Sequence, residues 1–227
     1  TSSTSTQNTK WRAEDSKNRA REWNQLHPTC IRRIERLPRL RPPMPGPRGI
    51  EPGDAAPDFR LPNANSSAGA EQMSLSDVSR ASGTVVLFTC NHCPYVVGSE
   101  ERIEAIANKA RGLDMGFVGI NSNDPIAYES DNWDSMVKRA GKGMTYAYLH
   151  DASQEIAHSY GAERTPEFYL LDGGGTVVYR GRLDDAPRNP MDATTAELAE
   201  AMDALAFGGA IANPRTDSIG CSVKWKQ

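Results

Sequence analysis

Two cysteines three residues apart, Cys90 and Cys93, carry the most evident chemistry in this sequence. At the first turn of a helix, thiols with that spacing can close a disulfide and reopen it. The thiolate is the attacking form of cysteine, and the unpaired N–H groups of a helix N-terminus stabilise it. We therefore predict that Cys90 attacks a disulfide and that Cys93 resolves the mixed disulfide. Positive character on His92, between them, favours the thiolate and predicts a pair more oxidising than one without histidine.

The elements predicted around this motif place it between a strand and a helix. Residues 84–89 form a continuous β-branched and aromatic run, which is typical of a buried strand. Residues 95–111 have helical spacing and end at Gly112. Further strands are predicted at 117–120, 146–149, 168–171 and 177–182, and further helices at 131–140, 153–160 and 194–207. This alternation predicts an α/β fold, with a central mixed sheet flanked by helices on both faces.

A second feature, Arg164-Thr165-Pro166, directly precedes the strand predicted at 168–171. A proline there must lie at an element boundary, because it cannot donate to a ladder. With a cis peptide bond it forms a tight turn that can face another part of the fold. A trans proline that opens the strand is the alternative.

The other cysteines and histidines give little support for a zinc site. Structural zinc takes four ligands, usually as two close pairs. The remaining candidates have no paired spacing: Cys30, Cys221, His27, His150 and His158. We therefore predict no metal and no organic cofactor. Cys221 has two interpretations, a third redox thiol on the C-terminal tail or a packed structural cysteine, and the sequence favours the second.

Together these motifs resemble the thioredoxin-fold superfamily. Within it they are most similar to the redoxin branch described as alkyl hydroperoxide reductase/thiol-specific antioxidant-like (AhpC/TSA-like). The resemblance covers about residues 50–227. The stretches that carry it are 53–59 (GDAAPDF), 88–96 (FTCNHCPYV), 119–124 (GINSND), 165–172 (TPEFYLLD) and 219–226 (IGCSVKWK).

The resemblance implies a thioredoxin-like fold in which a cis Pro166 packs opposite the CxxC motif. It implies that the backbone of Thr165 pairs with an extended substrate segment. Arg164 stands where relatives often have cysteine, and it places a cation near the expected substrate surface. Many thioredoxins also have a buried acid in the strand before the motif, and residues 84–89 contain none.

The sequence departs from the peroxidatic motif of typical peroxiredoxins, Pro-x-x-x-Thr-x-x-Cys. Aligned on Cys93, its Pro and Thr fall on Val86 and Cys90; aligned on Cys90, they fall on Gly83 and Leu87. The peroxidatic constellation is therefore absent. We predict a thiol–disulfide oxidoreductase in redox homeostasis, whose partners are protein or small-molecule thiols and disulfides and an external thiol reductant or oxidant. The alternatives are a redoxin-type thiol peroxidase, or a protein that carries copper or zinc on the CNHC motif.

The net charge of −3 over 227 residues hides two unlike parts. Residues 1–49 carry +7 and are Pro- and Arg-rich, which predicts a disordered basic extension, whereas residues 50–227 carry −10 and coincide with the redoxin resemblance. Clustered arginine can bind phosphates, but no nucleic-acid recognition fold accompanies it, and we expect no nucleic-acid partner.

We find neither a signal-peptide pattern nor an apolar run of about 18 residues, so we expect no membrane contact and a cytoplasmic location.

Overall fold

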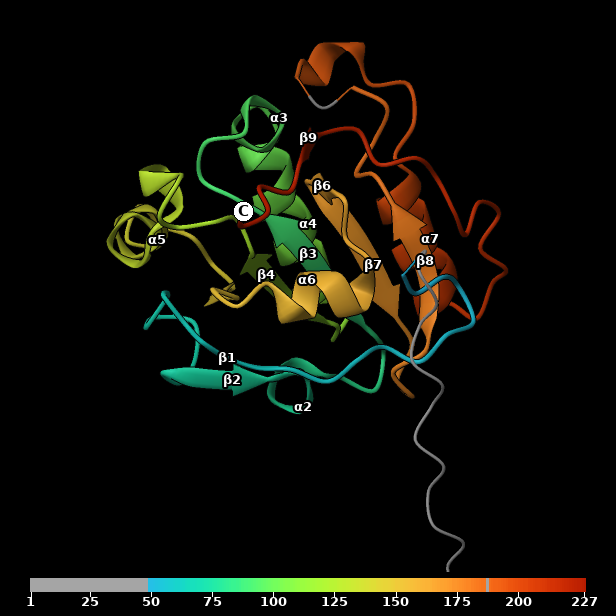
Figure 1. Ribbon diagram of the computed structural model, residues 1–227. Helices are drawn as coiled ribbons and strands as arrows, with labels where there is room; N and C mark the ends of the chain where they lie inside the picture. The colour runs from blue at the N-terminus through green and yellow to red at the C-terminus, as the bar shows by residue number, and fades with distance from the viewer. Residues whose placement is uncertain (1–48, 187) are drawn as a thin grey trace, which may run out of the picture. The chain divides into compact units, whose positions relative to one another are not determined.

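The computed structural model describes residues 49–186 and 188–227 of the chain (Figure 1). The predicted basic extension, residues 1–49, therefore lies almost entirely outside the described residues. Within the described part, no helix combines the length and the apolar character that crossing a membrane requires.

A five-stranded mixed sheet forms the centre, in the order β5-β4-β3-β7-β8. The strands β5, β4 and β3 run parallel to one another. On the other side of β3, β7 pairs antiparallel with β3, and β8 pairs antiparallel with β7. This arrangement confirms the predicted α/β class with a mixed sheet. The strands are β3 (Thr84–Thr89), β4 (Gly116–Asn121), β5 (Ala147–His150), β7 (Glu167–Leu171) and β8 (Val177–Gly181).

Helices cover both faces of the sheet, because successive strand residues point to opposite faces. On one face, Val85, Leu87 and the alternate residues of β7 pack against α4 (Glu100–Gly112) and α7 (Glu197–Ala206). On the other, Val86 and Phe88 pack with α2 (Leu75–Val78), α6 (Glu155–Tyr160) and the hairpin of β1 (Arg60–Pro62) and β2 (Gln72–Ser74). The sequence did not predict this hairpin. The other helices of residues 49–186 and 188–227 are α3 (Pro94–Val97), α5 (Trp133–Ala140) and the 3-10 turns η1 (Glu129–Asp131) and η2 (Pro190–Asp192).

A small second sheet lies beside the motif-bearing end of β3. It pairs β6 (Arg164–Thr165) with β9 (Cys221–Ser222), so that the C-terminal segment runs alongside the turn before β7 (Figure 1). The buried Glu167 holds this turn: its Oε2 accepts hydrogen bonds from the backbone N–H groups of Glu163 (2.8 Å) and Arg164 (3.1 Å). Its Oε1 accepts from Nε of the buried Arg180 at 2.9 Å. A paired and hydrogen-bonded carboxylate can be buried here, where an isolated one could not.

Candidate active site

The N-terminus of the helix after the CxxC motif lies at Cys93, one turn after Cys90, where the sequence places it. Pro94 occupies its first turn and Cys93 is its N-cap, while Gly98 ends α3 and α4 begins at Glu100. Proline favours the first helical position, where its missing N–H costs no hydrogen bond. The sequence predicts one unbroken helix over 95–111 with Cys90 at its N-terminus. The structure differs in both respects, because the helix is broken at Gly98 and its N-cap is Cys93. The helix N-terminus faces Cys93, and Cys90 lies in the preceding loop.

The two thiols of the motif lie against the turn at Pro166. The Thr165–Pro166 peptide bond is cis. Cys93 Sγ lies 3.1 Å from the backbone oxygen of Thr165, to which it donates when protonated, and Cys90 Sγ lies 3.5 Å from Thr165 Oγ1. Both cysteines are free thiols with no exposed surface. One threonine thus contacts both sulfurs of the pair.

Cys93, not Cys90, is the thiol with the lowered pKa. The hydrogen bond from the Cys90 thiol lowers the pKa of Cys93 to about 4; burial opposes this, and the Cys221 thiol and the N–H groups of Cys221 and Val96 add to it. The same hydrogen bond raises the pKa of Cys90, and burial and the charge of Asp131 act in the same direction. The prediction that Cys90 carries the thiolate was based on a helix N-terminus that the structure places at Cys93.

A buried carboxylate, Asp131, organises the CxxC loop from a different element. Its Oδ1 accepts from the backbone N–H of Asn91 (2.6 Å) and from Asn121 Nδ2 (3.1 Å). Its Oδ2 accepts from Asn123 Nδ2 (2.9 Å) and lies 2.6 Å from His92 Nδ1. The His92 ring also stacks on Tyr128, with ring centroids 5.3 Å apart. His92 is therefore held by a carboxylate and an aromatic ring.

Two further side chains hold the loop that contains Asn91. Tyr148 donates from its hydroxyl to Asn91 Oδ1 at 2.8 Å, and burial raises its pKa well above the usual value. Arg139 Nη1 donates to the backbone oxygens of Cys90 and Asn91, both at 3.1 Å. These contacts leave the loop few alternative positions.

Sequence reasoning missed Asp131, Tyr148 and Arg139. The order of the strands indicates which segment approaches the CxxC loop. Because β3 and β4 are parallel neighbours, the segments that follow both strands lie at the same edge of the sheet. The segment after β4 therefore had to approach the CxxC loop. Its composition, however, does not single out Asp131 among several acidic residues there.

The C-terminal strand occupies the backbone edge that the resemblance assigns to a substrate. Thr165 pairs with Cys221, and Arg164 pairs with Ser222. Arg164 is exposed, and its guanidinium donates to the backbone oxygen of Gly220 at 3.4 Å. In this structure, then, the chain's own tail lies where an extended substrate was expected.

Comparisons with known proteins identify the family of this chain. The family model for redoxin matches residues 51–199. The chain belongs to the redoxin family. No curated protein matches it.

Two solved structures resemble this redoxin along most of its length. An uncharacterized conserved protein from Geobacillus kaustophilus is 39% identical, with 77% of this chain and 92% of that chain covered and a TM-score of 0.72. A hypothetical protein from Sinorhizobium meliloti is 38% identical, with coverage of 78% and 96% and a TM-score of 0.69. A peroxidoxin from Mycobacterium tuberculosis, at 20% identity, coverage of 69% and 96% and a TM-score of 0.50, shares the fold alone. Family and fold confirm the predicted thioredoxin-like redoxin and give the chain a redox function in general terms, as an oxidoreductase.

Three potential metal ligands of the redoxin lie together in this site. Atoms of Cys90, His92 and Asp131 lie within 4.8 Å of one another. Sulfur, imidazole and carboxylate together suit zinc, and sulfur and imidazole suit copper. Both oxygens of Asp131 are already engaged by hydrogen-bond partners. A metal would have to displace some of those partners.

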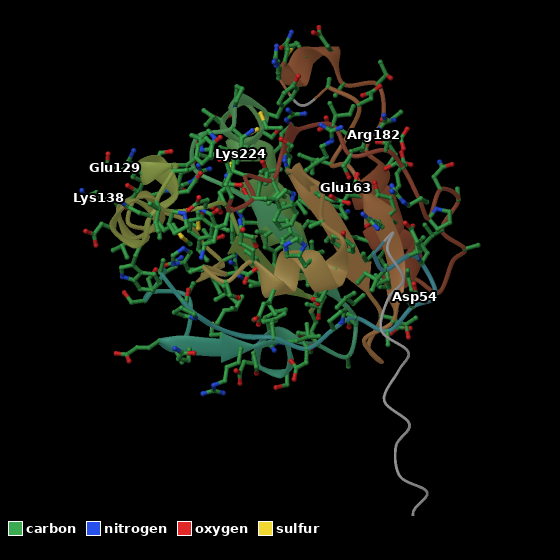
Figure 2. All side chains as sticks on the ribbon, in the orientation of Figure 1. Asp54, Glu129, Lys138, Glu163, Arg182 and Lys224 are labelled. Carbon is green, nitrogen blue, oxygen red and sulfur yellow. The ribbon has the colours of Figure 1, made fainter. Side chains whose placement is uncertain are left out.

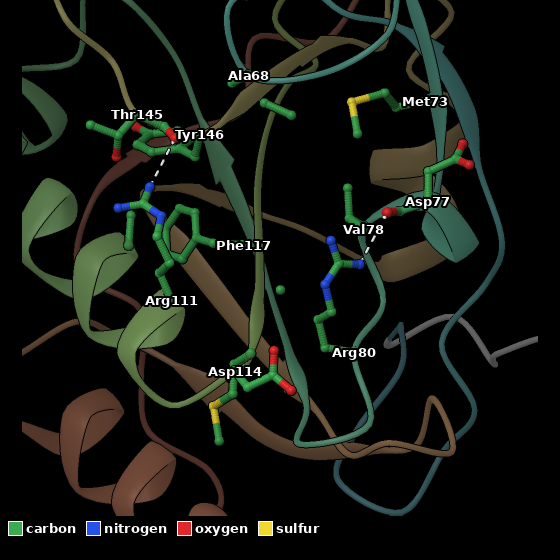
Figure 3. A pocket seen from close by; sticks show the side chains of 14 residues that line it. Ala68, Met73, Asp77, Val78, Arg80, Arg111, Asp114, Phe117, Thr145 and Tyr146 are labelled. Atoms are coloured by element: carbon green, nitrogen blue, oxygen red, sulfur yellow. Dashed lines mark hydrogen bonds between the residues drawn. The ribbon is translucent and has the colours of Figure 1, made fainter.

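A cavity of about 220 Å³ lies at the opposite end of the strands, beside Gly116, where β4 begins. Figure 3 shows Arg80 and Arg111 at its wall, each donating to a backbone oxygen, of Asp77 and Thr145 respectively. The CxxC motif follows the other end of β3, so this cavity has no part in the thiol site.

Proposed function

We propose that this redoxin is a thiol–disulfide oxidoreductase in which Cys90 and Cys93 cycle between dithiol and disulfide. The observation that carries the proposal is the hydrogen-bonded thiol pair against the cis-proline turn, with a lowered pKa at Cys93. When the pair is oxidised, a substrate disulfide gains two electrons and two protons and becomes two thiols. Another thiol system restores the dithiol.

The lowered pKa of Cys93 favours an order of attack opposite to the one predicted from the sequence. A thiolate attacks more readily than a thiol, and the lowered pKa of Cys93 supports Cys93 as the nucleophile. Cys90, whose thiol hydrogen-bonds that sulfur, is then the resolving residue. A thiolate in the reduced form stabilises that form and makes the disulfide a stronger oxidant. We therefore still expect the Cys90–Cys93 pair to be oxidising, but because of the lowered pKa of Cys93 and not because of His92.

Reduction of insulin by dithiothreitol tests the proposal. We expect the full-length chain to accelerate the precipitation of reduced insulin, and a Cys90→Ser/Cys93→Ser chain to give the uncatalysed rate. We also expect no consumption of hydrogen peroxide. Peroxide consumption without disulfide reduction would instead establish the thiol peroxidase.

Metal handling is a second candidate, favoured by the grouping of Cys90, His92 and Asp131 within 4.8 Å. Stoichiometric copper or zinc retained after purification, and lost in His92→Ala, would support it. A chain that purifies without metal and gains none on dialysis against either ion would reject it.

A further inference from the structure

We propose that Cys221 is a third redox-active thiol, which forms a disulfide with Cys93 and connects the buried Cys90–Cys93 pair with thiols and disulfides outside the protein. The proposal rests on the thiol–disulfide function proposed above. It departs from the packed structural cysteine that the sequence favours.

The pairing of β9 with β6 brings Cys221 to the site. Cys221 lies directly opposite Thr165, and opposed residues of an antiparallel pair have Cβ atoms about 5 Å apart on the same face. Thr165 itself contacts both Cys90 and Cys93. Cys221 packs in the same apolar cluster as those two residues, and its thiol faces the sulfur of Cys93. All three thiols of the described residues therefore meet at one threonine.

The residue before Cys221 allows this close approach. A Cβ atom at Gly220 would lie 2.2 Å from the backbone oxygen of Thr165 and 3.1 Å from the nitrogen of Pro166. Any side chain at position 220 would push the tail away from the turn, because the atoms it meets are backbone.

Hydrogen bonds further along the tail hold the strand in place. The N–H of Val223 donates to the backbone oxygen of Glu163 (3.0 Å), and the N–H of Lys224 donates to Asn123 Oδ1 (2.8 Å). Gln154 Nε2 donates to the backbone oxygen of Lys224 at 2.9 Å. Figure 2 labels Lys224 on this segment and Glu163 near β6. The Val223 side chain is buried. Such anchoring favours a fixed position for Cys221.

Exposure distinguishes the three thiols. Cys90 and Cys93 have no exposed surface, whereas Cys221 is partly exposed. Buried thiols react slowly with external reagents, since exchange requires access to the sulfur. Cys221 is thus the sulfur of the cluster that an external thiol or disulfide can reach.

The exchange needs no further oxidant. An external disulfide reacts with Cys221 to give a mixed disulfide and one external thiol. Cys93 then attacks the Cys221 sulfur, forms Cys93–Cys221 and releases the second external thiol. Cys90 next attacks Cys93, forms Cys90–Cys93 and frees Cys221, which takes up the proton that Cys90 loses. Two protein thiols have been oxidised and one disulfide reduced to two thiols. In reverse, an external thiol attacks Cys221 in the Cys93–Cys221 disulfide, and the low pKa of Cys93 makes it the better leaving group.

Oxidised glutathione added to the reduced full-length chain tests this relay. Cys30, outside the described residues, is replaced by serine throughout. Trypsin places Cys90 and Cys93 on one peptide, residues 81–102, and Cys221 on another, residues 216–224. The chain that carries only Cys30→Ser is the parent of every variant. We expect this parent to show an early cross-link between the two peptides that gives way to the Cys90–Cys93 disulfide. Cys90→Ser should accumulate the cross-link, and Cys93→Ser should form none.

The decisive comparison is Cys221→Ser. We expect its Cys90–Cys93 disulfide to form at least about tenfold more slowly than in the parent but to reach the same equilibrium with glutathione. Gly220→Ala, which keeps every thiol, should be slowed in the same way. Oxidation of Cys221→Ser at the parent's rate, faster oxidation of Gly220→Ala, or no cross-link in Cys90→Ser would each overturn the relay. If the parent itself forms no Cys90–Cys93 disulfide, the proposed function fails as well.

Discussion

Replacing Cys93 by serine should reduce disulfide exchange by this redoxin to the uncatalysed background, a larger loss than replacing Cys90. Cys93 is the central sulfur of the cluster, because it contacts the Cys90 thiol and the Cys221 thiol. Its removal eliminates the low-pKa thiolate and both protein disulfides at once. Cys90→Ser keeps the thiolate and the Cys93–Cys221 pair, and we expect it to retain part of the activity.

Rates of insulin reduction measure this difference. The two variants are a matched pair, since each exchanges one buried sulfur for oxygen. The order predicted from the sequence, with Cys90 as nucleophile, requires the opposite ranking. An inactive Cys90→Ser chain beside a Cys93→Ser chain that still catalyses insulin reduction would restore that order.

Replacing Asp131 by alanine should destabilise the fold by about 3–5 kcal/mol, the usual cost of breaking a buried charged network. The carboxylate is fully buried, and its loss leaves the N–H groups of Asn91, Asn121 and Asn123 without their acceptor. It also frees the ring of His92. Urea denaturation of the reduced chain measures the change in free energy of unfolding.

Glu129 provides the control, because it lies in the same 3-10 turn but is exposed (Figure 2). Glu129→Ala should change the free energy of unfolding by no more than about 0.5 kcal/mol. If Asp131→Ala stays within about 1 kcal/mol of the wild type, Asp131 does not organise the CxxC loop in the way its contacts indicate.

The sequence predicted the central sheet well, because its strands are buried and carry continuous apolar runs. Residues 84–89 and 168–171, for example, correspond to β3 and β7 almost residue for residue. The break between α3 and α4 was missed, since the apolar positions Val96 and Ile103 keep helical spacing across Gly98. Independently of that break, α3 begins at Pro94, so the helix N-terminus lies at Cys93 instead of Cys90.

The tail and the carboxylate were harder to predict for a different reason. The two-residue strand β9 is too short to show a periodic pattern, and only its pairing with Thr165 defines it. Asp131 meets His92 across 39 residues of sequence. Both contacts depend on which segments the sheet brings to one edge, which local patterning does not specify.

The redox equilibrium of the Cys90–Cys93 pair against glutathione buffers tests the central claim most directly. The fraction of disulfide is read by thiol trapping and mass spectrometry of the full-length chain with Cys30→Ser. A pair that keeps Cys93 ionised should be more oxidising at neutral pH than thioredoxin, at about −270 mV. Since its oxidation then releases one proton for two electrons, its potential should change by about 30 mV per pH unit between about pH 5 and pH 8. A pair as reducing as thioredoxin, with a slope of about 59 mV per pH unit, would contradict the account.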